Sequence, residues 1–303
     1  MVTCVVTVGE PMVELWEEAS GTVHQSFGGD ALNVAVYLAR AAPEVRVMLG
    51  SAIGDDDMSG ALVELCTLEG VDTSHLARVP RTRIGTYLVR VDDAGERTFE
   101  DRRSHSPFRG SLDAGDDLLP DPARVDLLWF SGITLAVLHD LGRERLLGYA
   151  GSVRGVGGQV AYDPNYRPTL WGDVEEARRW AIRAASSADI VLASVDDGRQ
   201  LMDRTGARAV TDAFLEMGAK EVVVTDGPAP CVLASNGRVE EMPSIVANAV
   251  VVDTTAAGDA FDAGYLSRRV HGADPSSCAI AGHRLAARVV AHRGAIIPAE
   301  RSS

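Results

Sequence analysis

Short apolar runs rich in β-branched residues alternate with longer segments of helical periodicity, and this alternation constrains the fold more than any other feature of the sequence. The apolar runs predict strands at residues 2–8, 45–49, 125–130, 159–162, 190–193 and 221–225. The periodic segments predict helices at residues 30–42, 58–69, 143–154, 174–187, 211–217, 257–271 and 275–292. Strands that alternate with helices form parallel sheets with helices on both faces. The sequence therefore predicts an α/β fold of three layers, α/β/α, around a central, mostly parallel sheet.

Two stretches interrupt this alternation and predict antiparallel ribbons, one pairing residues 12–16 with 22–27 and one pairing residues 84–91 with 97–102. A small sheet inserted near the start of an α/β domain has no core of its own. We therefore expect it to fold over a ligand as a β-sheet lid, formed by residues 11–27 and 82–104 of a single domain that spans residues 1–303. The segment 104–122 is rich in Gly, Pro, Ser and Asp and is expected to be a loop.

The charged residues limit how this chain could hold a phosphate group. The 29 Lys and Arg residues against 43 Asp and Glu give a formal net charge of −14, which argues against nucleic acid as a partner. Lys220 is the one lysine of the sequence. Walker loops, protein kinases and Schiff-base enzymes need a lysine at the ligand, and the surroundings of Lys220 fit none of them. Phosphate would have to be held by arginines and backbone amides.

The apolar runs and the cysteines bear on the compartment. No run approaches the roughly 20 apolar residues of a membrane span, and the strand-like segment at residues 2–8 is not preceded by a basic leader, so we expect a cytoplasmic protein without membrane contact. The four cysteines lie far apart and form no Cys-x-x-Cys pair, which predicts reduced and mostly buried thiols at Cys4, Cys66, Cys231 and Cys278.

The strongest chemical signal is the segment 251–264, VVDTTAAGDAFDAG. The small residues Ala256, Ala257 and Gly258 open a long helix and leave backbone N–H groups accessible to an anion, which the positive end of the helix dipole also attracts. Asp259 then falls in the first turn, where it could accept the proton of an incoming hydroxyl while the amides stabilise a transferred phosphoryl group. The alternative is that Asp259 only complements the helix dipole.

A second signal is the segment 27–40, which begins with Gly28 and Gly29. Paired glycines allow a ligand close to the backbone, Asp30 could cap a helix and hold a hydroxyl, and Asn33 lies one turn further on. This mixture of acceptor and amide suits a polyol. The alternative is a glycine turn with an asparagine facing solvent.

In this order the two segments resemble the two signature regions of the ribokinase (PfkB) family of carbohydrate kinases, and the resemblance extends over essentially the whole chain. Residues 253–261 match the second signature, with Ala256 where the family more often has Gly. Within the family the chain is most similar to bacterial 2-keto-3-deoxygluconate kinases. The segments that carry this similarity are 9–12 (GEPM), 27–33 (FGGDALN), 131–136 (SGITLA), 163–171 (DPNYRPTLW) and 293–298 (RGAIIP).

The resemblance implies a ribokinase-like fold and an ATP-dependent kinase of a small sugar acid, with Asp259 as base and the amides of Ala256, Ala257 and Gly258 as anion hole. It further implies ATP and Mg²⁺ as cofactors and allows a monovalent cation. Independently of the resemblance, an open lid with unpaired strand edges would need covering, which suggests a homodimer formed through the lids. The substrate positions that the resemblance implies, together with Asp30 and Asp259, are Gly29, Asn33, Tyr87, Arg103 and Arg167. The nucleotide positions are Ser194, Thr225, Gly227 and Gly258, with Asp197 near Mg²⁺ through water.

The residues themselves support the position of Arg167, whereas the segment that contains Arg103 leaves the identity of the sugar open. Arg167 follows an expected strand end, where an arginine could clamp a carboxylate bidentately, although it could also be a surface arginine beside a proline. Residues 100–103, Glu-Asp-Arg-Arg, replace aromatic residues that deoxygluconate kinases carry before the lid arginine. A kinase of a neutral sugar such as fructose therefore stays open as an alternative. So does a regulator that binds sugar or nucleotide without catalysis, because the Asn-x-x-Glu segment of the family appears here in the less typical form Ser194-Val-Asp-Asp197.

Overall fold

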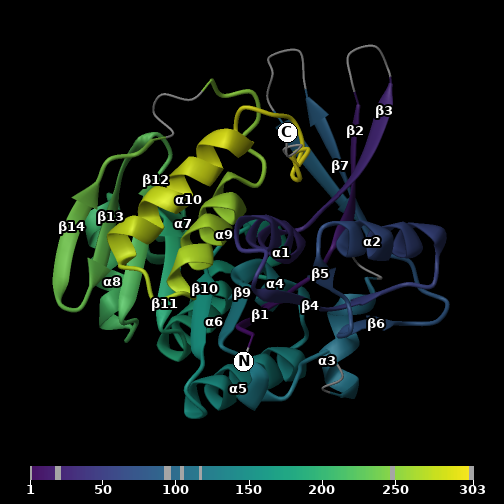
Figure 1. Cartoon of the computed structure of the whole chain (residues 1–303), viewed down its shortest axis with the longest axis horizontal. Helices are drawn as coiled ribbons and strands as arrows, with labels where there is room; N and C mark the ends of the chain where they lie inside the picture. Colours follow the sequence, from purple (N-terminus) through teal and green to yellow (C-terminus); the bar gives the residue numbers. More distant parts are fainter. Residues whose placement is uncertain are drawn as a thin grey trace.

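A ten-stranded sheet forms the centre of the molecule (Figure 1). The computed structural model describes residues 2–17, 22–91, 97–102, 106–115, 118–245 and 250–299. The sheet has the order β14-β13-β12-β11-β10-β9-β1-β4-β5, with β6 also paired to β4. Its strands are β1 (Cys4–Val8), β4 (Arg46–Ile53), β5 (Val71–Asp72), β6 (Leu76–Arg78), β9 (Leu127–Ser131), β10 (Gln159–Asp163), β11 (Ile190–Ser194), β12 (Glu221–Asp226), β13 (Ala229–Ser235) and β14 (Arg238–Met242). Pairing is parallel from β5 to β12 and antiparallel at β13 and β14, which confirms the predicted mostly parallel sheet.

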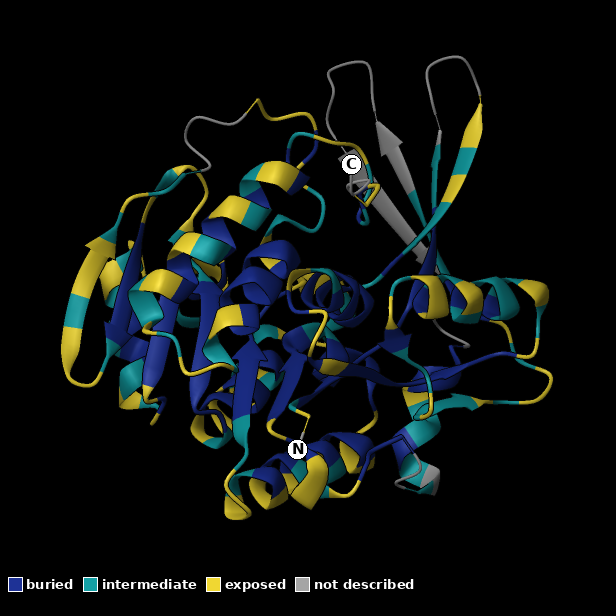
Figure 2. Ribbon diagram, viewed as in Figure 1, coloured by how far each residue is buried: buried dark blue, intermediate teal, exposed yellow. Residues whose placement is uncertain are grey.

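Helices cover both faces of this sheet because consecutive strand residues point to opposite sides. Trp129 of β9 belongs to the buried cluster packed by α1, α2, α9 and α10, whereas the next residue, Phe130, belongs to the cluster packed by α4, α5, α6 and α8. Figure 2 shows buried central strands and exposed residues on the outward helix surfaces. The predicted three layers are therefore present. The helices are α1 (Asp30–Ala41), α2 (Asp57–Leu68), α3 (Ser111–Ala114), α4 (Gly132–Val137), α5 (Asp140–Gly155), α6 (Val174–Ser187), α7 (Val195–Met202), α8 (Ala207–Glu216), α9 (Ala257–Arg269) and α10 (Pro275–Val289).

A second, four-stranded sheet projects away from these layers (Figure 1). Its order is β3-β2-β7-β8, formed by β2 (Met12–Glu17), β3 (Val23–Gly28), β7 (Gly85–Val91) and β8 (Arg97–Arg102). Both predicted antiparallel ribbons exist, and the parallel pairing of β2 with β7 joins them into one sheet. We call these four strands the small sheet.

The segment 104–122 is not wholly a loop, as the sequence suggested. It contains a 3₁₀ turn at Pro107–Gly110, followed directly by α3. Ser106 caps the turn by accepting a hydrogen bond from the N–H of Phe108, and Pro107 suits its first position. The fully buried side chains of Phe108 and Leu112 then anchor the segment under the sheet. Among the described residues, no helix is both long and apolar enough to cross a membrane.

Candidate active site

A cavity of about 850 Å³ lies at the carboxyl ends of the parallel strands, where ligands of open α/β sheets usually bind. Its walls come from the turn after β1, the start of α1, the loop after β10, the β11–α7 junction, the end of β12 and the start of α9. The predicted site residues that line it are Gly29, Asp30, Asn33, Tyr87, Arg167, Ser194, Asp197, Thr225, Ala256, Ala257, Gly258 and Asp259. Gly227 is not among the lining residues, and Arg103 lies outside the residues that the structure describes.

The turn before α9 presents backbone amides to this cavity. Ala256 caps the helix in the left-handed conformation, with φ 59°, which a residue with a Cβ rarely adopts. This explains why glycine is the more usual residue at this point of the motif. The N–H of Ala257 donates to the carbonyl of Thr254 at 3.2 Å. Within the described part of the chain the N–H groups of Ala256 and Gly258 have no acceptor, so they remain available to an anion.

Asp259 is 8% exposed and lies in the first turn of α9, directly after these amides. Its Oδ2 accepts a hydrogen bond from Nδ2 of Asn33 on α1, at 2.7 Å. Burial, and secondly the negative charge of Asp30, raise the pKa of Asp259 to about 6, against the opposing effects of the Asn33 hydrogen bond and the charge of Arg167. A carboxyl group with a pKa near neutrality suits a general base.

Five further buried carboxyl groups line the same cavity, those of Glu10, Asp30, Asp163, Asp197 and Asp262. Asp30 accepts hydrogen bonds from the N–H of Ala31 and from the hydroxyl of Ser131. Burial, followed by the neighbouring negative charges, raises the pKa of Asp163 well above its usual range. Burial does the same to Asp262, although the indole N–H of Trp129 donates to it at 3.0 Å.

Asp262 and Glu10 also line the cavity, although neither was predicted from the sequence. The sequence does contain a signal for Asp262. It stands three residues after Asp259 among small and apolar residues, and residues three apart lie on the same face of a helix. Glu10 is 3% exposed and follows a buried strand, and its place in the cavity depends on the turn into the small sheet. The turn packs directly against Gly29 at the start of α1. Residue 29 must be a glycine because its φ is +108° and because a Cβ there would lie 2.3 Å from the carbonyl oxygen of Glu10.

The loop after β10 brings Arg167 to the cavity. Asn165 has a positive φ of 33°, and the exposed Arg167 is steadied by a bond from its Nη1 to the carbonyl of Tyr166 at 3.0 Å. The N–H of Tyr166 in turn donates to Oδ1 of Asp197 at 2.8 Å. The guanidinium group is therefore held at the mouth of a cavity whose floor is acidic.

The carboxylate of Asp197 is engaged by the protein on both oxygens. Besides Tyr166, it binds the N–H and hydroxyl of Ser194, at 3.0 and 2.6 Å, in a capping box that starts α7. This arrangement leaves room for an indirect contact with Mg²⁺ through water, because that ion commonly keeps several waters. No group of three or more His, Cys, Asp or Glu residues with metal-binding geometry exists among the described residues.

The small sheet contributes Tyr87 to the cavity. Tyr87 of β7 lies opposite Glu14 of β2, and its hydroxyl donates to Oε2 of that buried carboxylate. A Cβ on Gly28 would collide with the Tyr87 hydroxyl, which explains the need for glycine there.

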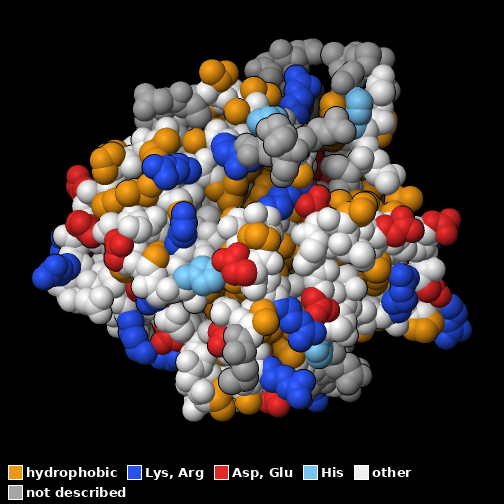
Figure 3. Space-filling view, viewed as in Figure 1, with side chains coloured by type: hydrophobic (Ala, Val, Ile, Leu, Met, Phe, Trp, Pro, Cys, Tyr) orange, Lys and Arg blue, Asp and Glu red, His pale blue; other side chains and the backbone are white. Residues whose placement is uncertain are grey.

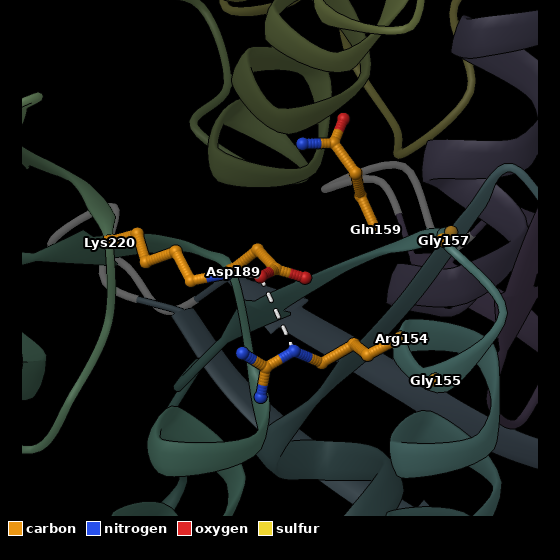
Figure 4. Close-up of a pocket in the computed structure, with 7 residues that line it drawn as sticks. Arg154, Gly155, Gly157, Gln159, Asp189 and Lys220 are labelled. Carbon is orange, nitrogen blue, oxygen red and sulfur yellow. Dashed lines mark hydrogen bonds and ion pairs between the residues drawn. The ribbon is translucent and has the colours of Figure 1, made fainter.

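A second cavity, of about 520 Å³, surrounds Lys220 at the opposite ends of the strands (Figure 4). Lys220 and Arg154 both pair with Oδ1 of Asp189, at 2.8 and 3.3 Å, and the N–H of Val160 binds its other oxygen. The C-termini of α5 and α6 lie at this edge, where cations are favoured by the helix dipoles. This cluster therefore stabilises the fold. Over the face shown in Figure 3, acidic and basic side chains are interspersed.

Comparison with known proteins places the chain among sugar kinases. The model of the pfkB family carbohydrate kinases matches residues 2–301. A 2-dehydro-3-deoxygluconokinase of Dickeya dadantii is 36% identical over 299 residues, covering 97% of this chain and 96% of that protein. The enzyme of the same name from Escherichia coli K12 is 35% identical over 302 residues, covering 98% and 97%. The crystal structure of a putative ribokinase II from E. coli in complex with ATP and Mg²⁺ has a TM-score of 0.83 at 22% identity, covering 97% of this chain and 94% of that one. The chain therefore belongs to the PfkB family of carbohydrate kinases.

Proposed function

We propose that this protein is an ATP-dependent 2-keto-3-deoxygluconate kinase, which transfers the γ-phosphoryl group of ATP to the terminal hydroxyl of the sugar acid. The observation that carries the proposal is the start of α9, where a buried carboxyl of raised pKa, Asp259, follows the accessible amides of Ala256 and Gly258. The relatives named 2-dehydro-3-deoxygluconokinase, which is the same activity, support the substrate.

In the proposed reaction, Asp259 accepts the proton of the attacking hydroxyl, and the bond from Asn33 holds the carboxylate in place. The amides of Ala256 and Gly258 face the transferred phosphoryl group and stabilise its developing charge without a lysine, whereas the N–H of Ala257, the third expected donor, is already bonded to the carbonyl of Thr254. The site is chemically suited to a nucleotide, because the cavity is large and its amides are free. Ser194, Thr225, Gly227 and Gly258 would hold ATP.

Mg²⁺ would neutralise the phosphate charge when bound. The related structure with ATP and Mg²⁺ supports this cofactor. Asp197 would reach the ion through water, since both of its oxygens already bind protein groups.

For the sugar acid, Arg167 is the proposed partner of the carboxylate, because guanidinium and carboxylate groups pair bidentately. Gly29, Asp30, Asn33, Tyr87 and Arg103 are the proposed positions around its hydroxyl and keto groups. The small sheet would close over the substrate as a lid, since Tyr87 already reaches the cavity from it.

We further propose how the protein assembles, which ions it needs and in which compartment it works. The outer strands β3 and β8 are open edges of the small sheet, and pairing of two lids in a homodimer would cover them. Gel filtration with light scattering tests this, and a monomer at micromolar concentration would refute it. A dependence on a monovalent cation is tested by comparing turnover in potassium, sodium and choline salts. The four thiols are free and buried, as predicted, which suits a reducing cytoplasm. We further propose that residues 1–303 form a single domain.

The proposed function is tested by a turnover panel with ATP and Mg²⁺ and four acceptors: 2-keto-3-deoxygluconate, its galactonate epimer, fructose and ribose. We expect the highest kcat/KM with a deoxy keto acid. Preference for fructose would establish a neutral-sugar kinase instead. Calorimetric binding of sugar or nucleotide without ADP release would establish a regulator.

A further inference from the structure

Residues 293–298, which we call the C-terminal segment, lie against the small sheet after α10 (Figure 1). The guanidinium of Arg293 lies 5.9 Å from the ring centre of Trp16 on β2. The Cβ of Ala295 is 3.2 Å from the point where a Cβ on Gly28 would stand, at the end of β3. Ala295 and Ile297 are buried. The segment is thus a packed part of the fold beside the entrance to α1.

Tyr37 fixes this segment to α1. Its hydroxyl donates to the carbonyl of Ala295 at 2.6 Å and accepts a hydrogen bond from the N–H of Ile297 at 3.0 Å. The side chain is 1% exposed, and burial raises the pKa of Tyr37 to about 12, so the hydroxyl keeps the proton that it donates. Nη1 of Arg40, three residues further along α1, binds the carbonyl of Ile297 at 2.7 Å.

The other end of the segment is bonded to the turn that precedes α9. The N–H of Gly294 donates to Oδ2 of Asp253 at 3.0 Å, and Oδ1 of the same carboxylate accepts the N–H of Thr255 at 2.7 Å. Ala256 follows at once in its left-handed conformation. Such a conformation persists only where the surrounding structure holds it.

These contacts form a closed network of hydrogen bonds and main chain around the proposed reacting groups. From Tyr37 the network runs through the C-terminal segment to Asp253, then through the turn to Asp259. It returns to α1 through the bond between Asp259 and Asn33, one helical turn before Tyr37. Tyr37 itself does not line the cavity.

We propose that Tyr37 is a positioning residue for phosphoryl transfer, which sets the anion-hole turn relative to Asp259 by holding the C-terminal segment and, through it, Asp253. This inference rests on the proposed kinase function. Loosening the segment would let the turn relax and shift its amides relative to the base. A misplacement of the order of 1 Å costs up to about a hundredfold in rate. Among the proposed sugar-binding side chains, Tyr87 and Arg167 lie on other elements, and Asp30 and Asn33 are held by α1, which the loosened segment leaves in place, so sugar affinity should be preserved.

The test compares Tyr37→Phe with Tyr149→Phe. The control variant also removes one hydroxyl, which in the wild type donates to the carbonyl of Pro120 at 2.8 Å. The Tyr149 ring, however, packs in the cluster on the opposite face of the central sheet. Both variants should lose thermal stability to a similar degree. We expect kcat to fall about tenfold in Tyr37→Phe and to stay unchanged in Tyr149→Phe. KM for the sugar acid should stay within about twofold in both variants.

Wild-type kcat in Tyr37→Phe, or an equal fall in both variants, would overturn the positioning role. So would a rise of KM for the sugar acid with unchanged kcat. If Tyr37→Phe does not fold, Arg40→Gln replaces it, with Glu69→Gln as its control. Both break the Arg40–Glu69 ion pair, whose shorter contact is 2.6 Å, but only the first frees Ile297. Equal kcat in these two variants would likewise overturn the inference. A wild-type protein without turnover on any acceptor would instead refute the proposed function, and the positioning role with it.

Discussion

Asp259 should reduce the stability of the folded protein at the pH where it would act. Its pKa in the fold is about 6, against an ordinary value of 3.8, mainly because the group is buried and secondly because Asp30 is close. When a carboxyl has a raised pKa in the folded state, the unfolded chain releases the proton more readily. Stability is then lost as pH rises from about 4 through about 6. We therefore expect Asp259→Asn to stabilise the protein at pH 8 while abolishing turnover.

The size of the effect follows from the two pKa values. The interval from 3.8 to about 6 corresponds to roughly 3 kcal/mol at about 1.36 kcal/mol per pH unit. An asparagine has the same shape and can still accept the bond from Asn33, but it attracts the guanidinium of Arg167 less strongly. We expect a gain of about 2 kcal/mol at pH 8 and little gain at pH 5. Turnover should fall by about 10³-fold, as for loss of a general base.

Urea unfolding of both proteins at pH 8 and pH 5 measures this difference. The exposed pair Arg208–Asp212 offers a matched control, since Asp212→Asn should change the free energy of unfolding by less than about 0.5 kcal/mol at either pH. Equal or lower stability of Asp259→Asn at pH 8, or a gain that does not depend on pH, would refute the reasoning. Near-normal turnover in that variant would remove Asp259 as the base.

Three other predictions follow from the same site. In the wild-type enzyme kcat/KM should fall as pH drops below about 6, because the base must be ionised, and a flat profile between pH 5 and 8 would contradict this. Arg167→Ala should raise KM for the keto acid far more than for fructose in steady-state assays, whereas equal effects would indicate a structural arginine. Ala256→Gly should relieve the strain of the left-handed conformation, but glycine also gives the unfolded chain more conformational freedom, which offsets part of the gain. Urea unfolding should therefore show a free energy of unfolding raised by less than about 1 kcal/mol. Ala256→Val, with a β-branched side chain at φ 59°, should instead lose stability.

The sequence predicted the central sheet well because its strands are buried on both sides and read as continuous apolar runs. The hairpin of β13 and β14 was missed, since β14 lies at the sheet edge and none of its residues is buried, so it lacks a continuous apolar run. The short helices α4 and α7 were missed for a different reason. Each begins with a capping box at the end of a strand, so its start lies in side-chain hydrogen bonds and not in an apolar period.

The site was predicted where one segment carries both the chemistry and its local geometry, as the start of α9 does. Contacts between distant segments could not be predicted in the same way. The engagement of Asp197 by the N–H of Tyr166 depends on how α7 meets the loop after β10, and the bond from Trp129 to Asp262 depends on how β9 packs against α9. Ala256 is an intermediate case. The sequence shows an alanine where the motif more often has glycine, but only the φ value of 59° shows that this alanine is in a left-handed conformation.

The bond between Asn33 and Asp259 joins residues 226 positions apart, and Tyr37 reaches Ala295 across 258. During synthesis the first half of the sheet can therefore collapse on the ribosome long before its catalytic partner exists. The site forms in one late step of high contact order. A nascent chain that stalls before α9 would carry the proposed sugar-binding turn without the proposed base, and we expect it not to consume ATP.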